Sequence, residues 1–220
     1  MLKSDLHLHC SADPKDSISY SDEELINHAS KLNFNVLSIT CHDLQHYTSE
    51  LVKYAKKKGI LLIPGMEKTI QGKHVLLYNF EQKELDKINK LNDIDKYKTK
   101  DNLVICPHPF IPLPSSLLWN FKKYLYLFDA IEYCHFYTCT TNHNWITKQL
   151  TNLPFVGNSD AHFLSQMNHT YSLINSKPEI SKVITAIKEN QLKLHSTPLS
   201  HLEIFKHVTS FIAGKLGKHF

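Results

Sequence analysis

Strand-like and helix-like stretches alternate along the chain, and this alternation constrains the fold more than any other feature of the sequence. Apolar runs of strand length are expected at residues 5–9, 35–40, 60–64, 74–78, 103–106, 130–133, 155–157 and 170–174. Helical patterns are expected at residues 21–32, 49–58, 82–91, 116–125, 142–150 and 179–190. Such alternation predicts parallel βα units, with one early hairpin around residues 71–73.

The chain of 220 residues is long enough for one domain of barrel or doubly wound size. Near its end, apolar residues recur at helical spacing, namely Leu202, Phe205, Val208 and Ile212. Residues 199–220 are therefore expected to form a helix that packs on the barrel or at a dimer interface. Residues 1–198 are expected to form the domain itself.

The cationic side chains are all lysines, because the 25 Lys and Arg residues include no arginine. The formal net charge of +4 is a mild excess, and no stable nucleic-acid complex is expected from it. If a protein without arginine binds phosphate, it must use lysine, histidine, backbone amides or metal ions, because the planar fork of arginine is missing. Metal ions therefore rank high among the expected cofactors.

The start of the chain lacks the charged and apolar pattern of a signal peptide, and the five cysteines are an odd number. Apolar runs stay below the roughly 18 residues of a membrane span. The sequence thus predicts a soluble, cytoplasmic protein with reduced thiols and no membrane partner.

The stretch SDLHLHC, from Ser4 to Cys10, carries two histidines one residue apart. In a strand, His7 and His9 share one face while Leu6 and Leu8 share the other. Two interpretations stay open from this stretch alone: a polar strand face, or a pair of imidazoles that bind one metal ion.

Further metal-binding side chains follow the predicted strands closely. They are His42, Glu67, His108, His135, Asp160 and His162. In a barrel of parallel strands the C-terminal strand ends lie on one face, where barrel enzymes build their sites. Residues far apart in the sequence can therefore converge there.

Six segments resemble, in order, the motifs of the polymerase and histidinol phosphatase superfamily, the PHP domain. They are DLHLHC, SITCHD, GMEKTIQGKHV, CPHPF, AIEYCHF and GNSDAHF. The stretch NHTYSLI and the helix after it also resemble the C-terminal element of stand-alone PHP proteins. The resemblance covers roughly residues 1–199 and implies an α/β fold, a distorted (β/α)7 TIM-like barrel, with a trinuclear metal centre and phosphoesterase activity.

The resemblance also implies the metal ligands. The first ion would be bound by His7, His9, Glu67 and Asp160. The second would share Glu67 and add His74 and His108, with His135 at a further ligand position. The third would be bound by His42, His162 and Asp16, with Asp13 as the alternative to Asp16.

Two positions depart from the family pattern, which usually has aspartate at Cys41 and arginine at His169. Without that arginine, Lys68 and His169 are the expected substrate-binding residues, and Lys15 is a third candidate. Imidazole and carboxylate ligands suit two or three divalent ions of zinc, manganese or iron. A metal-bound hydroxide would then attack phosphorus, so no catalytic residue is assigned beyond the metal ligands.

The function expected first is hydrolysis of a phosphomonoester of a small molecule or nucleotide. Two alternatives stay open: a phosphodiesterase or nuclease that acts on nucleic-acid ends, and a non-catalytic metal-binding regulatory module. The expected partner is a small phosphorylated substrate, and a homo-oligomer is compatible with the sequence.

Overall fold

Ten strands form two five-stranded sheets in the computed structural model, which describes the backbone of residues 1–216 and the side chains of residues 1–209. The sheet orders are β10-β9-β1-β2-β3 and β4-β5-β6-β7-β8. The first sheet contains β1 (Leu2–Leu8), β2 (Val36–Ile39), β3 (Leu61–Leu62), β9 (Thr170–Ile174) and β10 (Leu192–Ser196). The second contains β4 (Gly65–Ile70), β5 (Lys73–Tyr78), β6 (Leu103–Cys106), β7 (Ala130–Cys134) and β8 (Phe155–Asn158).

The strand pairing is mixed, although mainly parallel units were predicted. Strands β1, β2 and β3 run parallel, as do β6, β7 and β8. The hairpin expected at residues 71–73 joins β4 to β5, and Gln71 and Gly72 take positive φ angles of 51° and 73° there. Strand β5 is also antiparallel to β6, and β9 is antiparallel to both β1 and β10. The list of predicted strands contained neither β4, which precedes the hairpin, nor β10.

The two sheets meet at two seams without closing into a barrel within residues 1–216. In this part of the chain, backbone β-pairing between the sheets is limited to two isolated bridges, one between Leu8 and Ala161 and one between His42 and Glu67. At one seam, side chains from the second sheet form the hydrogen bonds that the β1 backbone needs. The amide oxygen of Asn158 accepts the Leu6 N–H at 3.0 Å, and the Tyr78 hydroxyl donates to the Leu6 carbonyl at 2.7 Å. The α/β class is thus confirmed, and the seven-stranded barrel is replaced by two sheets that approach at their edges.

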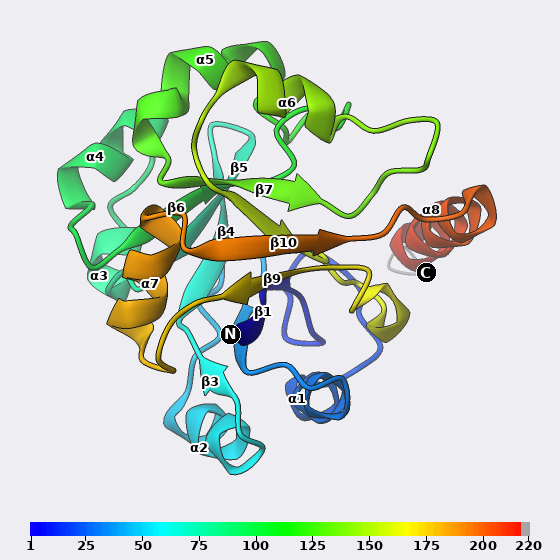
Figure 1. The fold of residues 1–220 in the computed structure, drawn as a ribbon, viewed down its shortest axis with the longest axis horizontal. Coiled ribbons are helices and arrows are strands. Elements are labelled where there is room, and N and C mark those ends of the chain that lie inside the picture. Colours follow the sequence, from blue (N-terminus) through cyan, green and yellow to red (C-terminus); the bar gives the residue numbers. More distant parts are fainter. Residues whose placement is uncertain (217–220) are drawn as a thin grey trace.

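Most of the helices surround the sheets (Figure 1). They are α1 (Asp22–Lys31), α2 (Ser49–Lys57), α3 (Gln82–Leu85), α4 (Ile94–Tyr97), α5 (Phe121–Tyr124), α6 (Asn144–Leu150), α7 (Ile180–Lys188) and α8 (His201–Leu216). The helix expected at residues 82–91 ends at Leu85, because the Asp93 carboxylate accepts the backbone N–H of Asn89 and Lys90 in a turn. The helix expected at residues 116–125 is reduced to α5 between two short 3-10 turns.

Helix α8 projects from the domain (Figure 1). Its Leu202 and Phe205 side chains are 62% and 65% exposed, so this part of the helix does not pack into the core. The side chain of Ile212 and residues 217–220 of the predicted helix lie outside the described residues. Within residues 1–216, every helix is too short or too polar to cross a membrane.

Candidate metal centre

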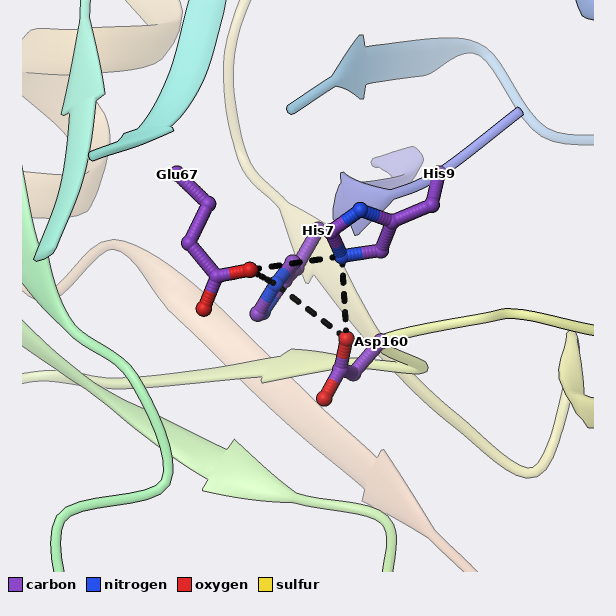
Figure 2. Close-up of side chains that lie close together, drawn as sticks. All are labelled: His7, His9, Glu67 and Asp160. Carbon is purple, nitrogen blue, oxygen red and sulfur yellow. Dashed lines mark hydrogen bonds and ion pairs between the residues drawn. The ribbon is translucent and has the colours of Figure 1, made fainter. Parts of the chain in front are cut away.

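The strand ends of both sheets bring four predicted ligands together. His7 lies on β1, His9 follows it, Glu67 lies on β4 and Asp160 follows β8. Figure 2 shows the four side chains pointing toward one another. One ligand atom from each residue lies within 4.8 Å of those of the others.

The local backbone explains how these side chains reach one point. The alternation of β1 places His7 and His9 on one face and the buried Leu6 and Leu8 on the other. Asp160 takes a φ of 47°, in the left-handed region that non-glycine residues seldom adopt. Such strained backbone conformations are concentrated at functional sites in proteins.

The outer nitrogens of three imidazoles are held by buried carboxylates. His7 Nδ1 lies 2.8 Å from Glu132, while His9 Nδ1 and His42 Nδ1 lie 2.9 and 3.0 Å from one oxygen of Asp13. A carboxylate accepts hydrogen bonds, so each Nδ1 carries the proton and donates. In the neutral ring, Nε2 then keeps its lone pair, which is the arrangement of metal-binding histidines.

The inner nitrogens of the same three rings face one carboxylate oxygen. The Nε2 atoms of His7, His9 and His42 lie 3.2, 3.4 and 3.1 Å from Glu67 Oε2. Two acceptors that face each other at this distance repel unless a proton or a cation lies between them. His7 Nε2 is also buried without a hydrogen bond of good geometry among the described residues. These donor atoms fit a divalent cation of the kind that imidazole and carboxylate bind.

The other oxygen of Glu67 faces the residues expected at the second ion. His74 Nδ1 lies 2.7 Å and His108 Nε2 lies 3.4 Å from Glu67 Oε1. His108 Nδ1 lies 3.0 Å from the Ser116 hydroxyl, which fixes the orientation of that ring. Glu67 is therefore the residue on which both expected sites converge.

The residues expected at the third ion lie on the opposite side of His42. His162 Nε2 lies 3.0 Å from Asp16 Oδ2, and His42 Nδ1 lies 3.6 Å from the same oxygen. Asp13, the alternative to Asp16, accepts from the His9 and His42 rings and from the His42 backbone N–H at 2.8 Å. Asp13 therefore orients two rings, while Asp16 stands opposite His162.

Burial and charge shift the pKa values of the central groups in opposite directions. Burial alone raises the pKa of Glu67, but the imidazoles of His7, His108 and His74 outweigh it and hold the pKa well below its ordinary value. Burial alone lowers the pKa of His7, but Asp160 and other carboxylates outweigh it and raise that pKa well above its ordinary value. Without a metal ion, these shifts favour ionised carboxylates and a protonated His7 ring at neutral pH, so a cation that binds His7 Nε2 must replace that proton.

Three predicted residues lie apart from this convergence. His135 lines the cavity beside the Gln166 amide, with 3.5 Å between their nitrogens, and belongs to none of the ligand groups found among the described residues. Lys68 follows Glu67 on β4 and is not among the cavity-lining residues. His169 lies 3.9 Å from Glu203, also away from the cavity lining. The lysine that does line the cavity is Lys15.

Sequence reasoning missed the role of Glu132. This fully buried carboxylate accepts from His7 Nδ1 at 2.8 Å, from the His108 backbone N–H at 2.9 Å and from the Asn158 amide at 3.1 Å. The sequence did contain a sign of this role, since Glu132 is a charged residue inside the apolar strand predicted at residues 130–133. A carboxylate is seldom fully buried unless it has hydrogen-bond partners. Asp5 is a second buried carboxylate, and burial raises its pKa to about 7.

The cluster forms part of the lining of a cavity of about 570 Å³. Its metal-binding part is lined by Asp16, His42, Glu67, His74, His108, Asp160 and His162. A cavity of this size holds a small molecule as well as ions. The fold and the site together describe an α/β protein whose clustered imidazole and carboxylate groups could hold divalent ions beside a partly open cavity.

Comparison with known proteins agrees with this description. The model of the PHP-associated family matches residues 147–192, which include β8, β9 and α7. No curated protein matches the sequence. The family match and the fold support membership of the PHP superfamily, as the ordered motifs predicted.

Several solved structures share the fold at low sequence identity. One is a two-domain protein from Bacteroides vulgatus that contains a predicted PHP-like metal-dependent phosphoesterase; it is 18% identical, with a TM-score of 0.65 over 96% of this chain and 69% of that chain. PsfC from Pseudomonas syringae is 16% identical, with a TM-score of 0.65 over 97% and 98% of the two chains. The lesion-specific endonuclease Q from Pyrococcus furiosus is 15% identical, with a TM-score of 0.61 over 88% of this chain and 57% of that chain.

Proposed function

We propose that the protein is a metal-dependent phosphoesterase that hydrolyses a phosphomonoester of a small molecule or nucleotide at a centre of up to three divalent ions. The observation that carries the proposal is the convergence of three imidazole Nε2 atoms on one oxygen of Glu67, with distances of 3.1 to 3.4 Å. Similarity to PHP-like phosphoesterase structures supports the fold that this chemistry uses.

The residues divide the proposed centre into three positions around Glu67 and His42. The first position would be bound by His7, His9, Glu67 and Asp160, and the second by Glu67, His74 and His108. Asp16 and His162 would form the third position. His42 is also expected there, but its Nδ1 is bound to Asp13 and its Nε2 is directed at Glu67, so its lone pair faces the second position beside His74. Divalent ions held there would lower the pKa of a bound water and stabilise negative charge on the phosphate oxygens.

The remaining residues hold these side chains in position. Glu132 and Asp13 fix the rings of His7, His9 and His42 through Nδ1, so little rearrangement is needed when a cation binds. The Gln166 amide oxygen accepts the backbone N–H of His162 at 2.7 Å and holds the loop after β8. Lys15 also lines the cavity, but its ammonium is paired with Asp43 and not free for a substrate anion.

The nuclease alternative receives less support from the cavity. Nucleic-acid sites combine a basic groove with stacking side chains along several nucleotides. Lys15 is the single lysine in the described lining, and it is already paired with Asp43 at 2.5 Å. The endonuclease Q structures share the fold, and their activity is a property of those proteins.

Hydrolysis assays with matched substrates test the proposal. The protein, loaded with manganese, iron or zinc, is assayed on glycerol phosphate and nucleoside monophosphates, and separately on phosphodiesters and an end-labelled oligonucleotide. Phosphomonoester hydrolysis is expected, and Asp160→Asn should abolish it while the exposed Glu23→Gln leaves it unchanged. Equal rates for the Asp160→Asn variant, or preference for the oligonucleotide, would contradict the proposal.

A further inference from the structure

Part of the lining of the cavity is apolar. Six apolar side chains line it, in addition to the metal-binding residues: Ile111, Leu113, Pro114, Phe136, Phe163 and Val208. They come from four places in the sequence: the loop before α5, the loop after β7, the loop after β8, and α8. A phosphate group alone would leave most of this lining without a partner, because apolar lining is typical of sites that bury the body of a ligand.

Outside the metal-binding residues, five polar side chains also line the cavity: Lys15, Ser115, His135, Gln166 and His207. Lys15 is its only lysine in the described lining, and the Lys15 ammonium is bound to Asp43 at 2.5 Å and to the Thr69 hydroxyl at 2.6 Å. A substrate with a second phosphate would therefore lack a counter-charge there. The chemistry of the cavity fits one phosphate at the metal-binding end and an uncharged body at the other.

Aromatic rings from the loops after β7 and β8 and from α8 are part of the lining. The Phe163 and His207 rings are nearly parallel, with centroids 6.2 Å apart and an interplanar angle of 16°. Phe136 lies beside His135, at an edge-on angle of 79°. Aromatic ligands pack well against such faces and edges, because offset-stacked and edge-to-face contacts are both favourable.

We propose that this apolar part of the cavity receives an aromatic alcohol group of the phosphomonoester, so that Phe163 and the α8 residue Val208 determine substrate preference. The proposal rests on the proposed function for its phosphate end. It also gives α8 a role: the helix completes the substrate cavity through Val208 while Leu202, on the same helix, lies outside the lining.

Binding of two phosphonates tests the preference without requiring turnover. Calorimetry on the manganese-loaded full-length protein compares 2-phenylethylphosphonate with 2-hydroxyethylphosphonate. The phenyl compound should bind at least about tenfold more tightly, because it buries an apolar ring. Val208→Ala and Phe163→Leu should each reduce that ratio by about threefold or more, whereas Leu202→Ala should keep it.

Equal affinity for the two phosphonates would overturn the proposal, as would a ratio that both cavity variants leave unchanged. Phe163→Leu keeps an apolar side chain of similar size, and Val208→Ala changes a position on the surface helix, so at least one variant is expected to fold.

Turnover separates this proposal from the proposed function. The matched esters are 2-phenylethyl phosphate and 2-hydroxyethyl phosphate, both of primary alcohols. Hydrolysis of both at equal kcat/KM supports the phosphoesterase activity and overturns the aromatic preference. A phenyl preference in binding without hydrolysis of either ester supports the aromatic site and overturns the phosphoesterase activity.

Discussion

Glu132→Gln is the substitution that most sharply separates an orienting role from a general structural one. The side chain is fully buried and accepts three hydrogen bonds, from the His7 ring, the His108 backbone N–H and the Asn158 amide. Glutamine has nearly the same shape but offers one oxygen and one NH₂ group. In either orientation of the amide, its NH₂ group must face a donor.

The size of the effect can be worked from these contacts. Loss of a charge-assisted hydrogen bond together with one unsatisfied buried donor should lower the free energy of unfolding by about 2–3 kcal/mol. The His7 ring would also lose the acceptor that keeps its proton on Nδ1. Disruption of such an orienting partner weakens metal binding by about tenfold to a hundredfold.

Two measurements on the same variant check this prediction. Urea unfolding of the metal-free protein gives the stability change, and competition with a chelator gives the metal affinity. The control is Glu23→Gln, which removes one carboxylate at an exposed position in the first turn of α1. Metal affinity within about twofold of the parent protein, despite a clear stability loss, would show that Glu132 is structural and does not orient His7.

Three further outcomes are expected. Glu67→Gln should lower turnover at least about a thousandfold and reduce metal content, as measured by kinetics and elemental analysis, because an amide is a poor partner for two cations. Burial lowers the pKa of His135 from 6.5 to about 3, so the folded protein keeps this ring neutral while the unfolded chain protonates it below pH 6.5. The free energy of unfolding is therefore highest above pH 6.5 and decreases as the pH falls toward 3. His135→Gln should remove up to about 5 kcal/mol of this decrease, measured by urea unfolding across the same pH range. Gly157→Ala should lower the free energy of unfolding by about 1–3 kcal/mol in urea, because the added Cβ would lie 2.8 Å from the Tyr171 carbonyl oxygen.

The strand pattern predicted most of the fold, because buried strands are marked by apolar runs in any sequence. The parallel units and the hairpin at Gln71 and Gly72 follow from period and turn chemistry alone. Strand β10 was missed because its half-exposed residues show no apolar run. The open seams could not be predicted, since they depend on Asn158 and Tyr78, whose side chains reach the backbone of Leu6 from distant strands.

The candidate site was predictable where residue type and strand position coincide. His7 lies near the end of β1, and His9 and Asp160 follow β1 and β8, as predicted. Glu67, predicted to follow a strand at residues 60–64, lies inside β4 instead. The division of roles between Asp13 and Asp16 depends on the path of a loop that carries no periodic signal. Glu132 was missed because a buried carboxylate on a strand becomes meaningful only when its donors from β1 and β8 are known.

Elemental analysis of the purified protein tests the central claim most directly. The protein is expressed with manganese, iron and zinc supplied, purified without oxygen and never exposed to chelator, beside the Glu67→Gln variant. Convergence of the imidazole nitrogens on Glu67 predicts two or three transition-metal ions per chain in the parent protein and fewer in the variant. A parent protein that holds no metal under these conditions would contradict the assignment of the whole centre.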